Sequence, residues 1–186
     1  PHHPPFAAWP LAPTAHLFLF VHRVNKLPSG LYALCRHPDA EDRLRSACSA
    51  RFLWESVDPE LPLFRLQTGD FVYEAIQTSC DQAIAGYSAF SLGMLAEFHP
   101  RLRREPTHYR TAFWEAGMVG HLLYLEAEAQ RYRGTGIGCF FDDGMHQLLG
   151  LQDREFQSLY HFTVGTPVED DRLQTLPAYP HRESAH

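Results

Sequence analysis

The sequence predicts an α+β fold built around one long, buried helix. Over 114–130, apolar residues recur on two adjacent faces at the 3.6-residue period of a helix, which is typical of a helix surrounded by other elements. The runs at 16–24 and 31–36 are rich in β-branched and aromatic residues and flank a Pro-x-Gly turn, which predicts a β-hairpin. Strands and helices do not alternate regularly, so parallel βαβ units are not indicated.

The remaining elements follow from the spacing of apolar residues and from the turn residues between them. Apolar residues alternate with their neighbours over 89–98, which predicts a strand because successive strand side chains point to opposite faces. Asp39, and later Asp142 and Asp143, are suited to cap helices. The other expected elements are a helix over 39–48, a strand over 61–66, a helix over 70–80, a strand over 139–141, a short helix over 144–150 and a strand over 158–165.

The composition describes a chain that can build one core. Its 186 residues are 45% apolar, which predicts a single domain over 16–181 between a proline-rich arm, 1–15, and a tail, 182–186. The net charge of −6 and the scattered basic residues give no electrostatic footprint for nucleic acid. The apolar runs are far shorter than the ~20 residues that span a bilayer, and no signal pattern opens the chain. We therefore expect a soluble, cytoplasmic protein that binds neither nucleic acid nor membrane.

Cysteine and histidine spacing gives no sign of a metal site. The cysteines at 35, 48, 80 and 139 form no CxxC pair, so reduced and mostly buried thiols are expected rather than a disulfide framework. The twelve histidines include no HExxH motif. No bound metal is expected.

The stretch RGTGIGCFF, at 133–141, has three glycines at alternate positions. It does not fit a dinucleotide fingerprint, because a helix is expected before it and a strand after it, and no Gly-Lys-Ser or Gly-Lys-Thr of a phosphate loop follows. Gly134 can cap the preceding helix in the left-handed conformation, with Gly136 and Gly138 easing a tight connection. The alternative is that bare backbone amides lie flat against a planar ligand. Composition alone leaves both open.

The order of motifs around this stretch resembles a known family. A glutamate-alanine-glycine helix, the glycine-rich turn, a short helix ending in Leu-Gly-Leu and a strand ending in Val-Gly follow one another over 114–165. This block resembles the C-terminal half of a nitroreductase-family flavoprotein domain of the SagB-like branch. The segment 17–34, with its Leu-Pro-x-Gly-Leu-Tyr turn, is similar to the same branch. The segments 79–98 and 165–181 look like the second half of proteins that carry two such domains in tandem.

The resemblance implies a nitroreductase-like, antiparallel-rich mixed sheet and an FMN site at the interface of a homodimer or a tandem pseudo-dimer. FMN would transfer two electrons between NAD(P)H and a small organic or peptide-derived substrate. By residue match, the turn Gly136, Ile137, Gly138 and Cys139 would lie on the isoalloxazine ring, with an amide near Gly138 or Cys139 donating to flavin N5. Arg172 is the candidate phosphate partner, since a guanidinium matches a phosphate group. No catalytic residue is assigned.

The chain also departs from the family pattern. The family's N-terminal Arg-Arg-Ser segment has no counterpart, since the chain opens in mid-domain. Arg103-Arg104 stand where the azoline-oxidising branch has a Lys-Tyr pair, so azoline oxidation is disfavoured. His121-Leu122 replace a Gln-Asn pair, and His121 is expected to be a core histidine. Two functions remain open: an FMN-dependent oxidoreductase domain, and a flavin-free half that serves as a dimerisation or substrate-presenting partner.

Overall fold

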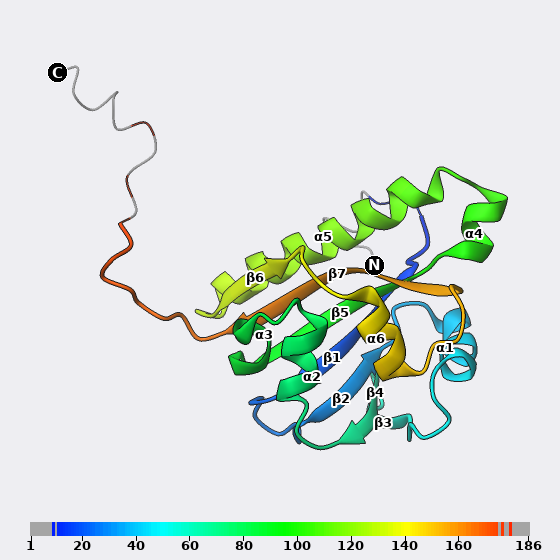
Figure 1. Ribbon diagram of the computed structural model, residues 1–186, viewed down its shortest axis with the longest axis horizontal. Helices are drawn as coiled ribbons and strands as arrows, with labels where there is room; N and C mark the ends of the chain where they lie inside the picture. The colour runs from blue at the N-terminus through cyan, green and yellow to red at the C-terminus, as the bar shows by residue number, and fades with distance from the viewer. Residues whose placement is uncertain (1–8, 10, 175, 177–178, 180–186) are drawn as a thin grey trace.

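The computed structural model describes residue 9, residues 11–174 and residues 176 and 179, and seven of its strands form one sheet (Figure 1). In chain order the elements are β1 (Ala15–Val21), β2 (Gly30–Leu34), η2 (Pro38–Ala40), α1 (Glu41–Ala47), β3 (Glu55–Asp58), β4 (Leu61–Thr68), α2 (Val72–Thr78), α3 (Ala83–Tyr87), β5 (Phe90–Glu97), α4 (His99–Arg104), α5 (His108–Ala129), β6 (Arg133–Ile137), α6 (Asp142–Leu149) and β7 (Phe156–Gly165). The strand order is β3-β4-β2-β1-β5-β7-β6, and each neighbouring pair is antiparallel. The predicted α+β fold with an antiparallel-rich sheet is confirmed.

The predicted hairpin is present, and its alternating side chains give the sheet two apolar faces. β1 and β2 pair through the expected turn, with Val21 opposite Gly30. Along β1, Phe18 and Phe20 belong to one apolar cluster and Leu17 to the other, because side chains alternate along a strand. Each face therefore needs its own cover of helices.

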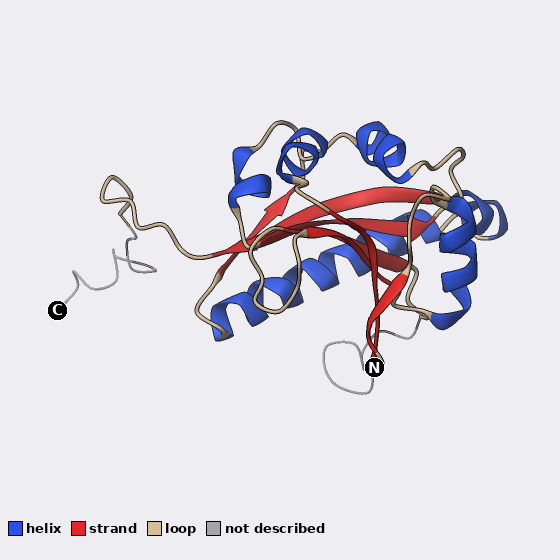
Figure 2. Cartoon of the chain, turned by 90° about the horizontal axis from the view of Figure 1, so that it is seen from below, coloured by secondary structure: helices blue, strands red, loops and turns tan. Residues whose placement is uncertain are grey.

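Helices cover the two faces unequally. Figure 2 shows the long helix α5 against one face of the sheet and several shorter helices against the other. The cluster under α5 includes Ala116 and Val119, whereas the opposite cluster includes Leu44 of α1, Ala75 of α2 and Met145 of α6. Because both faces are covered, β5 and β7 are buried along almost their whole length.

The long helix is confirmed, but the expectation that it is buried all round is wrong. It begins at His108, earlier than predicted, and only one of its faces is buried. Trp114 is 59% exposed and Leu125 is 53% exposed. His121 is also exposed, so the prediction of a core histidine there is wrong. The helix therefore presents a broad apolar face to its surroundings.

Small residues line the buried face of α5. Ala112, Ala116 and Gly120 face the sheet, and a Cβ on Gly120 would lie 2.8 Å from Cε1 of Tyr160 on β7. The large rings of this layer thus come from the sheet, and the helix supplies the space for them. A period of 3.6 finds the apolar faces of a helix, but it does not say which face meets the sheet.

The chain between α5 and α6 differs from the prediction. The strand expected at 139–141 lies earlier, as β6, and pairs with β7. Gln130 is the C-cap of α5, and Arg131 takes the left-handed conformation with φ 63°. Gly134 is therefore not the predicted left-handed cap. Among the described glycines, only Gly69 and Gly150 have positive φ.

Three short elements were not predicted, because four to six residues carry too little periodicity. The missed elements are β3, α3 and α4. Asp142 and Asp143 lie in the first turn of α6, whose N-cap is Phe141. Residues 1–8, 10 and 182–186 lie outside the described chain, so the boundaries of the arm and the tail stay predictions. No helix in the described part of the chain has the length and apolar character needed to cross a membrane.

Candidate functional site

Strand β6 carries two glycines that pack against aromatic rings. A Cβ on Gly134 would lie 2.7 Å from Cζ of Phe162, and a Cβ on Gly136 would collide with the hydroxyl of Tyr160. The N–H of Gly136 donates to Oη of Tyr124 on α5 at 2.7 Å. Because a close-packed layer does not absorb an added methyl group, both positions require glycine.

Ile137 ends the strand with its side chain in the core. It is 2% exposed and belongs to the apolar cluster under the short helices. Its backbone lies opposite His161 of β7. Of the four turn residues predicted to contact a cofactor, Ile137 can therefore offer only backbone atoms.

The chain opens to the surface over 138–141, which we call the open turn. Gly138 and Cys139 are exposed, and apart from its chain neighbours no described atom lies within 4 Å of a Cβ position on Gly138. Within the described chain, no acceptor receives a hydrogen bond from the N–H of Gly138 or Cys139. Such donors can serve a planar ligand that lies on the backbone, provided that no side chain holds it away.

Three contacts join the open turn to the end of α2. Cys139 forms a disulfide with Cys80. The carbonyl of Cys139 accepts a hydrogen bond from Nε2 of Gln82 at 3.1 Å, and the N–H of Phe141 donates to the carbonyl of Thr78 at 2.9 Å. The conformation of the open turn is thus set from outside its own sequence.

The disulfide corrects the prediction that all four cysteines are reduced thiols. Cys35 and Cys48 are free and buried, as expected. Cys80 and Cys139 are paired, with their Cα atoms 5.7 Å apart although they are 59 residues apart in the chain. No short spacing could have indicated this pair, because α2 and the open turn meet only in the folded chain.

Phe140 attaches the open turn to a buried histidine. Its ring stacks on that of His161, with centroids 4.7 Å apart and planes 11° apart. Nδ1 of His161 lies 3.1 Å from Oγ of Ser79, and Nε2 lies 3.2 Å from Oγ of Ser158. Burial lowers the pKa of His161 to about 4, so the imidazole is neutral at neutral pH. We interpret it as a rigid support for the turn rather than as a proton donor.

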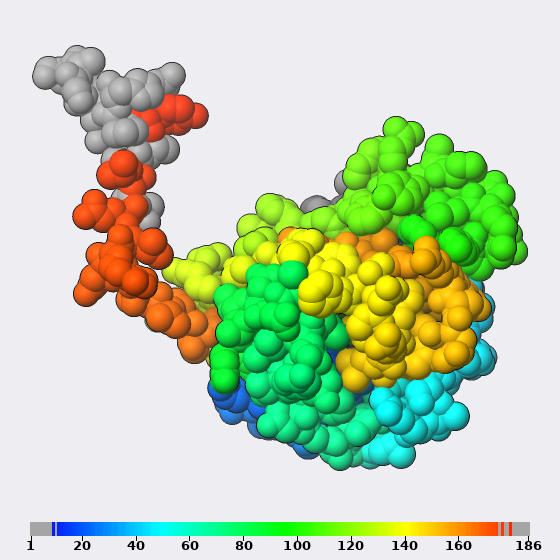
Figure 3. All heavy atoms as spheres, viewed as in Figure 1, coloured from blue at the N-terminus to red at the C-terminus, as the bar shows by residue number. Residues whose placement is uncertain are grey.

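A pocket of about 470 Å³ adjoins the open turn between α2 and α6. In Figure 3 these two helices lie on the same visible face of the molecule. The volume falls within the roughly 300–1,000 Å³ of small-molecule sites. The pocket is lined by Glu74, Gln77, Thr78, Asp81, Phe141, Gly144, Gln147 and Leu148. Its walls therefore combine carboxylates, amides and one aromatic ring.

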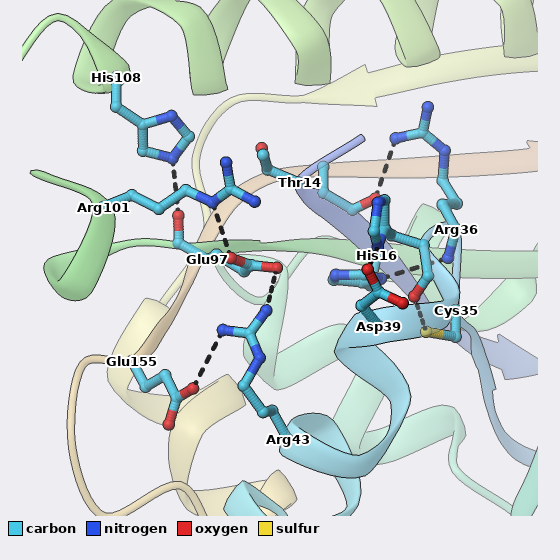
Figure 4. A network of polar contacts seen from close by, with 12 residues as sticks. Thr14, His16, Cys35, Arg36, Asp39, Arg43, Glu97, Arg101, His108 and Glu155 are labelled. Atoms are coloured by element: carbon cyan, nitrogen blue, oxygen red, sulfur yellow. Dashed lines mark hydrogen bonds and ion pairs between the residues drawn. The ribbon is translucent and has the colours of Figure 1, made fainter. Parts of the chain in front are cut away.

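A second polar cluster surrounds the buried Glu97 at the end of β5 (Figure 4). Its carboxylate lies 2.5 Å from Nη2 of Arg43 and 2.7 Å from Nε of Arg101. Arg43 also reaches Glu155 at 3.4 Å, and Nε2 of His108 lies 2.8 Å from the Glu97 carbonyl. The cluster connects β5 with α1, α4 and α5.

The charges of this cluster neutralise one another. Burial alone would raise the pKa of Glu97, but hydrogen bonds from Arg101 and Arg43 outweigh burial and lower that pKa below its ordinary value. Removing one partner would leave an uncompensated buried charge, which is strongly destabilising. We therefore assign Glu97 and its arginines to the fold rather than to catalysis.

The structure does not bring Arg172 to the open turn. Arg172 follows β7, whose end at Gly165 pairs with Arg133 at the start of β6, whereas the open turn follows the other end of β6. Figure 1 shows this segment leading away from the sheet. The guanidinium is exposed and lies 2.6 Å from the carboxylate of Asp170. Its role as a phosphate partner stays a prediction.

Sequence reasoning missed the residues that hold the site from other elements. Gln82 and Cys80 come from the turn after α2, and Tyr124 and Tyr160 come from α5 and β7. Their contacts with the glycine-rich stretch depend on pairings between distant segments. Only Tyr124 could have been suspected from the sequence. It lies in a helix that the pattern predicts to be buried, and a buried tyrosine hydroxyl needs a hydrogen-bond partner.

Solved structures with a similar fold include two putative nitroreductases and one enzyme complex. The first, from Anabaena variabilis, has a TM-score of 0.64 and 21% identity, and the match covers 83% of this chain and 27% of that chain. The second, from Ralstonia eutropha, has a TM-score of 0.53 and 14% identity over 85% of this chain and 60% of that chain. The E. coli microcin synthetase complex with truncated pro-MccB17 bound matches with a TM-score of 0.57 and 16% identity, over 84% and 53% of the two chains.

The chain thus spans less than two thirds of the length of each of these three proteins. Among curated proteins, no sequence matches it. The sequence model of the nitroreductase family matches residues 23–166, which is more than half of the chain. With the seven-stranded sheet and the three structural neighbours, this match shows that the chain belongs to the nitroreductase family.

Proposed function

We propose that this chain is an FMN-dependent oxidoreductase domain of the SagB-like branch, and that its open turn binds the flavin ring. The observation that carries the proposal is the pair of exposed N–H groups at Gly138 and Cys139, which no acceptor in the described chain engages. The open space beside Gly138 admits a flat ring to the backbone. Together these features meet the steric and hydrogen-bonding needs of an isoalloxazine edge.

The four turn residues have different parts in this proposal. Gly136 and Ile137 hold the end of β6 in place, the first through Tyr124 and the second through the core. Gly138 and Cys139 offer the N–H donors toward flavin N5. FMN, when bound, supplies two-electron chemistry, with a reduced nicotinamide or the substrate as electron source. The residues of this chain bind and orient the ring and keep water from one of its faces.

The phosphate of FMN needs a cation, and Arg172 remains our candidate. Its guanidinium is paired with Asp170 in an exposed position. Exposed ion pairs are weak in water, so a phosphate can compete with Asp170 for the guanidinium. The segment after β7 would then have to turn toward the cofactor.

The substrate is proposed to be a small organic or peptide-derived molecule. The pocket between α2 and α6 has a suitable volume, about 470 Å³, and it shares Phe141 with the open turn. A molecule in this pocket would lie beside the turn that we assign to the ring. Its aromatic and amide walls suit a substrate with both apolar and hydrogen-bonding groups.

The exposed face of α5 is proposed to pack against a second nitroreductase-like domain, either a second copy of this chain or a companion domain in a longer chain. Large exposed apolar patches mark interaction surfaces. Gly117 lies on this face with no atom within 4 Å of its Cβ position, so a partner helix can approach closely there. The large apolar side chains that α5 exposes are Tyr109, Phe113, Trp114, Tyr124 and Leu125.

An absorbance spectrum of the purified chain, with mass analysis of the small molecules released on denaturation, tests the flavin assignment. We expect flavin absorbance and the mass of FMN. A colourless protein whose melting temperature does not respond to added FMN would contradict the assignment. That result would favour the flavin-free alternative, in which the chain acts as a dimerisation or substrate-presenting partner.

Light scattering tests the pairing of α5. We expect a dimer at micromolar concentration, and we expect Leu125→Glu to produce a monomer because it buries a charge at the interface. Leu53→Glu is the matched control, since Leu53 is also an exposed leucine, 66% against 53% for Leu125, and lies outside α5. A wild-type monomer would count against pairing with a second copy of this chain, and a dimer that persists in Leu125→Glu would count against pairing through α5.

A further inference from the structure

The disulfide Cys80–Cys139 joins the two walls of the pocket beside the open turn. Cys80 lies in the turn after α2, directly before Asp81, and Cys139 lies within the open turn, two residues before Phe141. Asp81 and Phe141 both line the pocket of about 470 Å³. The cross-link therefore controls how far apart these walls can lie.

The backbone at Cys80 is held in an unfavourable conformation. Cys80 and Asp81 have φ values of 60° and 56°, in the left-handed region that residues with a Cβ seldom adopt. Two consecutive residues in this region persist only when the surroundings hold them. The disulfide, together with the bond from Gln82 to the Cys139 carbonyl, provides that restraint.

The four cysteines fall into two groups with opposite accessibility. Cys139 is exposed and Cys80 is half-buried. Cys35 and Cys48 are buried, and burial raises the pKa of both thiols, that of Cys48 to about 12. Thiol–disulfide exchange requires access of an attacking thiolate to sulfur, so only the first group can take part in it while the chain is folded.

We propose that Cys80 and Cys139 form a redox-active pair that exchanges with a dithiol reductant and thereby releases the open turn. A thiolate of the dithiol attacks Sγ of Cys139, and Cys80 leaves as a thiolate. The second thiol of the dithiol then displaces Cys139 and closes its own disulfide. Two electrons pass to the cysteine pair, which ends as two thiols, and the two protons come from the dithiol through solvent.

Reduction removes one of the contacts that fix the open turn. The hydrogen bonds from Gln82 and Phe141 and the stack of Phe140 on His161 remain, but each of these is a non-covalent contact. The left-handed turn at Cys80 can then relax, and the pocket walls can separate. The inference needs no bound flavin, so it can be tested whether or not FMN binds.

Thiol labelling of the native protein tests the exchange. The chain is purified in air, treated with increasing dithiothreitol without denaturant, alkylated and mapped by mass spectrometry. We expect no labelling before reduction, then labelling of Cys80 and Cys139 while Cys35 and Cys48 stay unlabelled. Free thiols at 80 and 139 in the air-purified protein, or a disulfide that resists the dithiol until the chain unfolds, would overturn the proposal.

Hydrogen exchange tests the release of the open turn. We expect the backbone amide of Phe141, which donates to the Thr78 carbonyl, to exchange at least about tenfold faster in the reduced protein and in Cys80→Ser than in the oxidised protein, because local opening becomes easier. Cys35→Ser is the control, since a serine hydroxyl can keep the hydrogen bond from Cys35 to the His37 carbonyl. It should exchange like the wild type. Unchanged exchange in the reduced protein would overturn the switch.

Discussion

The two ends of the glycine-rich stretch differ in what surrounds them. Gly134 and Gly136 lie in β6 against the rings of Phe162 and Tyr160, where a Cβ has no room. Gly138, which follows the strand, has no neighbour within 4 Å of its Cβ position. The same residue type therefore serves close packing at one end and leaves a surface free at the other.

This difference shows that glycine spacing alone does not identify a binding site. A glycine is required wherever a Cβ has no room, and that can be caused by the protein's own core or by a ligand. At Gly134 and Gly136 the core already accounts for the requirement. At Gly138 the described chain gives no steric reason and no positive φ, which leaves an external group as the explanation to test.

The largest effect is expected from Gly136→Val. The added side chain would meet the hydroxyl of Tyr160, and overpacking a dense layer in this way costs about 3 kcal/mol. Urea unfolding followed by circular dichroism should show this loss in the protein without added flavin. Stability equal to that of the wild type would mean that β6 and β7 are not packed as described.

Tyr160→Phe tests whether the collision with the Tyr160 hydroxyl causes the loss of stability. In the variant that combines Gly136→Ala with Tyr160→Phe, the colliding hydroxyl is gone, so part of the loss caused by Gly136→Ala should be recovered. A double-mutant cycle measures the coupling between the two positions. Additive losses would contradict a direct contact between them.

An intermediate loss of stability is expected when the pH is lowered, because of His161, whose ring stacks on Phe140 of the open turn. Burial lowers the pKa of His161 to about 4 from an ordinary value of 6.5. The unfolded chain therefore binds the proton first as pH falls, so this contribution is complete above pH 6.5 and is lost progressively toward pH 4. Between pH 7 and 5 we expect His161 to account for a loss on the order of 1–2 kcal/mol.

Urea unfolding between pH 7 and 5 measures whether stability falls with pH, and variants show whether His161 causes the loss. His161→Asn should flatten the dependence, whereas His121→Asn should not, because His121 is exposed on α5. His16 will keep part of the slope, since burial lowers its pKa to about 4 as well. A slope that does not change in His161→Asn would mean that His161 is not buried and neutral beneath Phe140.

The smallest effect on stability is expected from Gly138→Val. With open space around it and no positive φ, the valine should change the free energy of unfolding by less than about 0.5 kcal/mol. Flavin retention should nevertheless be abolished, because an isopropyl group beside the backbone would hold the ring away.

Melting temperatures with and without added FMN, for wild type and Gly138→Val, separate the two effects. We expect FMN to raise the melting temperature of the wild type only, since a ligand stabilises the state that binds it. A Gly138→Val protein already destabilised without flavin would indicate a packing role like that of Gly136. A wild type that does not respond to FMN would remove the reason to assign a flavin site here.

The sequence was sufficient for the elements whose pattern is local. The alternation over 89–98 appears as β5, the turn at 27–30 joins β1 and β2, and the helical period over 114–130 appears within α5. Each of these signals arises from neighbours within a few residues, because strand and helix periods are properties of the backbone itself. The nitroreductase family could be predicted for the same reason, from the order of motifs along the chain.

Only the tertiary structure decided which face of each element packs against the rest of the protein. It turned the small residues of α5 toward the sheet and left Trp114 and Leu125 exposed. It paired Cys80 with Cys139, and it divided three similar glycines into two packed ones and an open one. These outcomes depend on contacts between segments that are tens of residues apart. A local pattern specifies the period of a face, whereas the partner of that face is determined by the packing of the whole chain.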